Sequence, residues 1–148
     1  MRHLPRAKGI AFELEPTVFK LTSRNIVKLN APIELVHGSY KDLVRSRTHP
    51  VDYLIVVFVA PPWGDALRRD TGLRLDRTRP PILEIVQDFE QVYGTQPVLY
   101  VTEVHEVNEP EALKALEAAF DWSELRIYDV IVPGLQHGVL LGTRRWLS

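Results

Sequence analysis

The run of apolar residues from Val51 to Val59, VDYLIVVFV, constrains the fold of this chain more than any other feature. It is nearly continuous and rich in β-branched and aromatic residues, a composition that favours a β-strand. A strand without polar alternation is typical of a parallel sheet whose two faces are both covered by helices. We therefore expect an interior strand here, buried on both faces.

Strand-like and helix-like patterns alternate on both sides of this run. Apolar residues recur at helical spacing in 17–29, 80–93 and 109–122, while 39–47 is typical of a short helix or turn. Such alternation predicts an α/β fold with a doubly wound, mostly parallel sheet. A short link, 133–136, joins the last two strands; it cannot form a parallel crossover, so we expect these strands to be antiparallel. The strands are expected at 9–15, 33–37, 51–59, 97–104, 124–132 and 137–145.

Composition narrows the class of protein. The chain has 148 residues, 45% of them hydrophobic, and shows no linker, so we expect one domain over 1–148. A net charge of −1 provides no overall basic field for nucleic acid or membrane, and no apolar run approaches the ~20 residues of a membrane helix. The absence of cysteine excludes disulfides and favours a cytoplasmic location. The five histidines lack the spacing of metal ligands, so we expect no metal site.

Polar or aromatic residues follow each of the first three expected strands. In an open α/β sheet, ligands bind at the carboxyl ends of the strands. Glu13 and Glu15 end the first strand, Ser39 and Tyr40 follow the second, and the turn APPW follows the third. We expect these groups to surround a single cleft.

The order GIAFELEP, IELVHGSYKDL, VFVAPPWGD and a terminal hairpin resembles the class I S-adenosylmethionine-dependent methyltransferases over roughly residues 9 to 146. More narrowly, APPWGD followed by a polar loop and RPPILEIV resembles RNA guanine-N2 methyltransferases of the trimethylguanosine-synthase type. The resemblance implies a Rossmann-like sheet with an antiparallel hairpin at its end. It also implies S-adenosylmethionine as cofactor and an exocyclic amine of RNA or a nucleobase as methyl acceptor.

The resemblance assigns the cofactor contacts to the first two strand ends. Glu13 would accept hydrogen bonds from the ribose hydroxyls, with Glu15 as its neighbour, because one carboxylate offers two oxygens to vicinal hydroxyls. Ser39 and Tyr40 would contact the adenine edge, although the family often has Asp at the first of these positions. The alternatives are that the acids lie on the surface and that Tyr40 is a core aromatic at the start of a helix.

The resemblance assigns the acceptor site to Ala60, Pro61, Pro62 and Trp63. Trp63 would stack on the base, and stacking contributes about 1–3 kcal/mol per base. The carbonyls of Ala60 and Pro61 would accept the amine hydrogens from a turn that the prolines stiffen. The family tetrapeptide is Ser-Pro-Pro-Trp, and Ala60 lacks the side-chain acceptor of that serine. The alternative is a rigid loop in which Trp63 caps the core.

The family's first motif, a strand followed by a glycine-rich turn and a helix, does not occur in this sequence. No G-x-G is present, and only eight residues precede Gly9. The resemblance therefore implies a truncated domain in which the first strand and the first helix are missing. In the complete sheet, the missing strand would lie between the strands expected at 9–15 and 51–59. The sheet could instead close up without that strand, or a partner chain or a second copy could fill its place. We expect the chain to bind S-adenosylmethionine weakly or not at all and to self-associate through its unpaired strand edges.

Arginines cluster after the tryptophan, and they either form a solvated face or bind RNA phosphates. They are Arg68, Arg69, Arg74, Arg77 and Arg79. Three functions stay open: a methyltransferase, a non-catalytic methyltransferase-like domain that binds a partner or nucleic acid, and an unrelated small-molecule-binding α/β domain.

Overall fold

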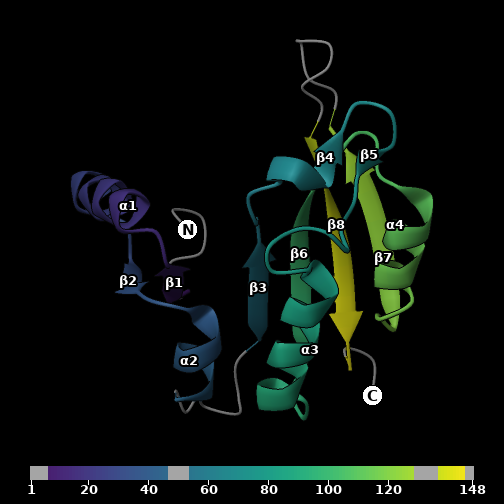
Figure 1. The fold of residues 1–148 in the computed structure, drawn as a ribbon. Coiled ribbons are helices and arrows are strands. Elements are labelled where there is room, and N and C mark those ends of the chain that lie inside the picture. Colours follow the sequence, from purple (N-terminus) through teal and green to yellow (C-terminus); the bar gives the residue numbers. More distant parts are fainter. Residues whose placement is uncertain (1–6, 47–53, 129–136, 146–148) are drawn as a thin grey trace. The chain divides into compact units, whose positions relative to one another are not determined.

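The computed structural model describes residues 7–46, 54–128 and 137–145, and the chain divides into two compact units, Met1–His49 and Pro50–Ser148 (Figure 1). We describe each unit by itself. Their α-helices and β-strands confirm the expected α/β class. No helix within the described ranges has the length and apolar character needed to cross a bilayer.

The first unit is a two-stranded parallel sheet with a crossover helix. Strand β1 (Gly9–Glu13) pairs with β2 (Ile33–His37), and Glu13 lies opposite His37 at the carboxyl ends. Between them, α1 (Pro16–Leu29) begins with a proline and ends at Asn30, whose φ of 47° is left-handed. A short helix, α2 (Tyr40–Arg45), follows β2. These elements match the patterns expected for 9–47.

The second unit is built on a four-stranded mixed sheet in the order β3-β6-β8-β7. Strands β3 and β6 are parallel, and β8 is antiparallel to both β6 and β7, which confirms the antiparallel end of the chain. The elements in chain order are β3 (Ile55–Val59), a 3-10 turn η1 (Gly64–Ala66), β4 (Leu67–Arg68), β5 (Gly72–Leu73), α3 (Ile82–Tyr93), β6 (Val98–His105), α4 (Pro110–Glu117), β7 (Trp122–Ile127) and β8 (His137–Arg144).

Helices α3 and α4 lie on one face of this sheet and bury the core there (Figure 1). Along β6, alternate residues are fully buried, among them Val98, Tyr100 and Val104. The Tyr100 hydroxyl lies 3.4 Å from the Val86 carbonyl of α3, and its ring packs on Phe120, just beyond α4, with centroids 5.5 Å apart. Buried and half-buried residues alternate strictly along β6, so one face of this strand is fully buried and the other is partly exposed.

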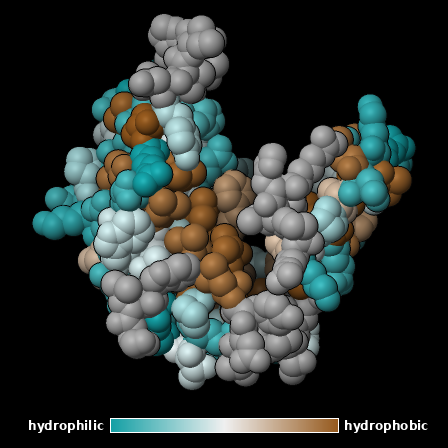
Figure 2. Space-filling view, turned by 180° about the vertical axis from the view of Figure 1, so that it is seen from behind, coloured by the Kyte–Doolittle hydropathy of each residue, from teal (hydrophilic) through white to brown (hydrophobic). Residues whose placement is uncertain are grey.

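The opposite face of the sheet corrects our expectation for β3. This strand is an end strand rather than an interior one, and Val56 and Phe58 are 55% and 65% exposed while Val57 and Val59 are buried. Figure 2 shows a hydrophobic area on the side turned away from the viewer of Figure 1. The expectation of burial on both faces is wrong because both long helices of this unit lie on the other face.

Several boundaries also differ from expectation. The six expected strands are present, but hydrogen bonding divides them between a two-stranded and a four-stranded sheet. The helix expected over 109–122 ends at Glu117, and Trp122 begins β7, because Asp121 donates its amide to the Thr143 carbonyl of β8 at 2.9 Å. The parts of the predicted strands at 51–53 and 129–132 lie outside the described residues.

Candidate functional site

Three aromatic rings meet at the carboxyl edge of the parallel pair β3 and β6. Trp63 follows β3, His105 is the last residue of β6, and His137 is the first residue of β8, directly opposite His105 in register. The Trp63 and His137 rings are stacked, with centroids 5.0 Å apart and an angle of 26°. The Trp63 and His105 rings form an edge contact at 5.7 Å and 88°. We call Trp63, His105 and His137 the aromatic cluster.

The side chain of His137 is held by an acid on the neighbouring strand. Its Nδ1 lies 3.1 Å from Oε1 of Glu103 in β6. Because an ionised carboxylate only accepts hydrogen bonds, this contact places a proton on Nδ1. His105 is also fixed, since its Nδ1 accepts the amide of Val107 at 3.1 Å.

The Trp63 side chain combines a ring contact with an unsatisfied donor. His137 covers part of one face of the indole, which leaves at most the other face for a stacked ligand. The Nε1 atom is buried and has no hydrogen-bond partner among the described residues. A buried donor without a partner costs about 1–3 kcal/mol, so the indole position is not explained by a hydrogen bond of its own.

The two prolines before Trp63 leave backbone acceptors exposed. Ala60 and Pro62 are exposed and Pro61 is half-buried. No hydrogen bond to the carbonyl oxygens of Ala60 and Pro61 occurs in the described part of the chain. Because proline has a fixed φ and no N–H, the turn presents acceptors with little competition from donors.

The segment after Trp63 is well anchored, although its composition predicts a polar loop. Leu73 and Leu75 are almost completely buried, and Leu73 exchanges hydrogen bonds with the segment after β6. Gly72 has a φ of +80°, and a Cβ there would overlap the Val107 carbonyl. Only a glycine fits this approach, so the loop carries Trp63 on a defined support.

The arginines of this loop fall into two groups. Arg74 forms an ion pair with Asp76 at 2.9 Å, which lowers the pKa of that carboxyl, and Arg68 lies 3.6 Å from Asp70. Within the described ranges, the other three, Arg69, Arg77 and Arg79, form no ion pair. A hollow of about 410 Å³ is lined by Asp65, Asp76, Arg77, Thr78, Arg79 and Pro81.

The candidate cofactor residues lie at the carboxyl edge of the first unit. One oxygen of Glu13, Oε1, accepts the amide of Glu15 at 2.8 Å, which orients the side chain and leaves Oε2 for a ligand. Glu15 itself caps α1 by accepting the amide of Val18 at 2.7 Å, and the backbone N–H groups of Thr17 and Val18 lower its pKa. Ser39 caps α2 by accepting the Lys41 amide at 3.3 Å, and Tyr40 is the first residue of that helix. The carboxylate that remains suited to ribose hydroxyls is therefore Glu13, not Glu15.

Glu13, Ser39 and Tyr40 belong to the first unit, and Ala60, Pro61, Pro62 and Trp63 to the second. Our expectation that they surround one cleft stays a prediction. Sequence reasoning missed His105, His137 and Glu103. The histidines lie at the ends of two expected strands, but only the register of the hairpin pairs them.

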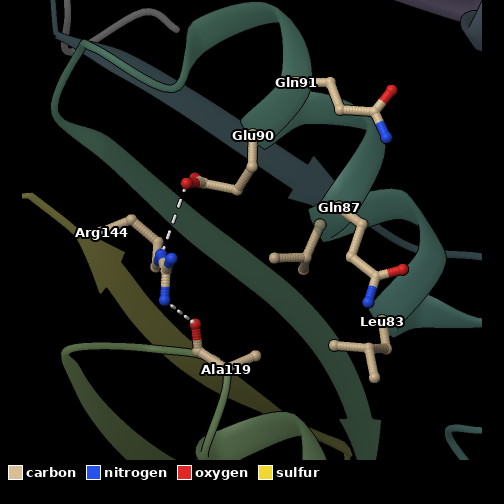
Figure 3. Close-up of a pocket in the computed structure, with 7 residues that line it drawn as sticks. Leu83, Gln87, Glu90, Gln91, Ala119 and Arg144 are labelled. Carbon is tan, nitrogen blue, oxygen red and sulfur yellow. Dashed lines mark hydrogen bonds and ion pairs between the residues drawn. The ribbon is translucent and has the colours of Figure 1, made fainter.

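A second hollow lies at the other end of the sheet, between α3 and the segment after α4 (Figure 3). Arg144 spans it, donating to the Ala119 carbonyl at 2.7 Å and lying 3.4 Å from Glu90, which also binds Arg145. Glu90 accepts the Tyr100 hydroxyl at 3.0 Å, and burial, with help from the Glu90 charge, raises the pKa of Tyr100. These polar groups bind one another, so we assign this hollow a structural role.

No group of three or more histidines or acids in the described ranges is arranged to hold a metal ion.

Comparison with known proteins shows the fold. No protein-family model and no curated protein matches the chain. The delta-N METTL16 MTase domain matches with a TM-score of 0.64 and 15% identity, over 91% of this chain and 62% of that one. A human methyltransferase 10 domain containing protein matches with a TM-score of 0.62 and 14% identity, over 91% of this chain and 60% of that one. The N-terminal domain of human METTL16 in complex with SAH matches with a TM-score of 0.59 and 13% identity, over 91% of this chain and 51% of that one.

The chain thus spans between about half and three-fifths of the length of these solved domains. The likeness confirms the expected fold, a Rossmann-like methyltransferase sheet with an antiparallel end.

Proposed function

We propose that the chain is an S-adenosylmethionine-dependent methyltransferase that acts on an exocyclic amine of RNA or a nucleobase. The observation that carries the proposal is the Ala60-Pro61-Pro62-Trp63 turn, which combines free carbonyl acceptors and an aromatic ring at the end of a parallel strand. Its setting is a fold shared with solved methyltransferase domains.

The turn is suited to an amine acceptor. A base that stacks on Trp63 would have its plane fixed, and the carbonyls of Ala60 and Pro61 would accept hydrogen bonds from its amino group. These contacts would orient the amine so that its nitrogen lone pair can face the methyl group of the bound cofactor. Transfer would form a nitrogen–carbon bond as the carbon–sulfur bond of the cofactor breaks, and the methylated amine would then lose a proton to water.

Glu13, Ser39 and Tyr40 would hold the adenosine half of the cofactor. The free Oε2 of Glu13 fits a ribose hydroxyl, and the Ser39 hydroxyl can still donate its proton while it caps α2. The cofactor would supply a methyl group that its positive sulfur makes electrophilic. One of the similar solved structures, the human METTL16 domain, is a complex with SAH.

We further propose guanine N2 as the amine. The support is the resemblance of APPWGD and RPPILEIV to the guanine-N2 methyltransferases. The alternative is a methyltransferase-like domain that binds a partner or nucleic acid without catalysis.

Transfer of a labelled methyl group from S-adenosylmethionine tests the proposal. We expect incorporation into a short single-stranded RNA that contains guanine, and less into one whose only amine-bearing base is adenine. Trp63→Ala should reduce transfer at least tenfold, whereas Trp122→Phe, an exposed tryptophan on β7, should leave it unchanged. Binding of RNA without transfer would support the non-catalytic alternative, and loss of transfer in both variants would exclude a specific role for Trp63.

A further inference from the structure

We propose that His137, held by Glu103, is a positioning residue for Trp63 and thereby sets the affinity for the methyl-accepting base. The inference rests on the proposed function, because it concerns the same aromatic ring. Neither His137 nor Glu103 belongs to the turn that the resemblance singled out.

The Trp63 side chain is oriented without a hydrogen bond of its own to the described residues. Its Nε1 donates no hydrogen bond to the described residues, so no polar contact fixes the indole plane. Two imidazoles do so instead: His137 is stacked at 26° and His105 meets the ring at 88°. Because the two contacts are nearly perpendicular, together they restrict both tilt and rotation of the indole.

His137 is in turn fixed by the sheet. His137 pairs with His105 across β8 and β6. Oε1 of Glu103, two residues before His105 on β6, lies 3.1 Å from its Nδ1. Groups that strands support are held more accurately than groups on loops. The loop residue Trp63 thus takes its orientation from two strands.

The arrangement has a consequence for the ligand. His137 covers one face of the indole, so a base can stack only on the other. The result is a stack of imidazole, indole and base in which the first two rings are ordered before the base arrives. A platform ordered in advance loses less entropy on binding, which raises affinity without any contact between His137 and the base.

Intrinsic fluorescence tests this inference on the full chain. Trp122→Phe and Trp146→Phe together leave Trp63 as the only tryptophan. In this background, fluorescence anisotropy reports the mobility of Trp63, and its quenching by a short guanine-containing RNA reports affinity. Neither measurement requires the cofactor or methyl transfer.

We expect His137→Ala to increase the mobility of Trp63 and to weaken RNA binding about fivefold. His137→Phe, which keeps a flat ring, should restore affinity to within about twofold, and Glu103→Ala should give an intermediate loss. Leu141→Val, four residues along β8 and paired with Val101 rather than with Glu103, is the control and should change neither quantity. Thermal melting of each variant separates a local effect from unfolding.

A Trp63 that stays immobile in His137→Ala, or one that becomes mobile with unchanged affinity, would overturn the inference. Failure of His137→Phe to restore affinity would also count against it. If the RNA does not bind the unaltered cluster at all, the proposed acceptor site is wrong instead, and anisotropy still decides whether His137 positions Trp63.

Discussion

Leu73 lies opposite Asn108 in an isolated parallel bridge that joins the loop after Trp63 to the turn after β6. The Leu73 amide donates to the Val107 carbonyl and its carbonyl accepts the Glu109 amide, both at 2.9 Å. The side chain of Leu73 is fully buried. Since the turn after β6 begins at His105, this bridge connects two members of the aromatic cluster through the backbone.

The bridge requires glycine at position 72. We predict that Gly72→Ala destabilises the chain by about 3 kcal/mol, because the new Cβ would overlap the Val107 carbonyl and φ is +80°. Gly64→Ala is the control: its φ is +45°, but no atom lies within 4 Å of the added carbon, so the loss should be about 1 kcal/mol. Urea unfolding measures both, and equal losses would show that the close approach to Val107 contributes nothing.

Local patterns predicted most of the elements, and the misses have physical causes. The helix from Pro16 and the strand Ile33–His37 were predictable because capping residues and apolar spacing are local signals. The exposure of Phe58 was not, because an apolar strand does not reveal which of its faces is covered. Gly72 was missed because its close neighbour, Val107, is distant in sequence.

In the candidate site, too, the residues that were missed depend on contacts between segments distant in sequence. Trp63 is a candidate from the sequence alone because Pro-Pro-Trp after an apolar run is unusual in itself. His137 is not, because its role depends on the register of β6 and β8 and on Glu103 on the adjacent strand. Glu13 and Glu15 could be distinguished only once the cap of α1 was seen.

Replacing Glu13 should affect ligand binding, whereas replacing Glu15 should affect folding. We predict that Glu13→Ala weakens S-adenosylmethionine binding about tenfold, the loss expected for a hydrogen bond to a charged group. Glu15→Ala should leave affinity within twofold because its carboxylate caps α1. Isothermal titration measures both, and the reverse order would assign the ribose contact to Glu15.

Acid should weaken the cap that Glu15 provides. The pKa of Glu15 is lowered in the folded chain, so its stabilising contribution is present above the ordinary carboxyl pKa and is lost as pH falls through the lowered value. We expect the melting temperature followed by far-UV circular dichroism to fall below about pH 4.5. Glu15→Gln should reduce the steepness of that fall, and an unchanged profile would show that other carboxylates account for it.

Arg77 and Arg79, which form no ion pair with the residues that the structure describes, should contribute to RNA affinity through charge. We predict that Arg77→Ser and Arg79→Ser each lower the slope of log affinity against log salt by about 0.7, as expected for one phosphate contact to a single strand. Arg74→Ser should change the slope less, because Asp76 already neutralises that arginine. Anisotropy of a labelled RNA over a range of salt concentrations provides the slopes. If all three variants match the unaltered chain, the loop is a solvated face.

The exposed side of β3 should mediate self-association. Val56 and Phe58 are exposed on one face of β3. This strand is also at the end of its sheet, and its outer edge pairs with no described strand. Unpaired strand edges recruit other strands. We predict that the chain forms dimers or larger species and that Phe58→Lys shifts it toward monomer, because a lysine on that face would have to lose its hydration in a contact between copies. Val27→Lys on α1, where the valine is 78% exposed, is the control and should leave the mass distribution unchanged. Light scattering coupled to gel filtration measures the mass. A monomeric unaltered chain would contradict the prediction, and a shift caused by Val27→Lys instead would place the contact on α1.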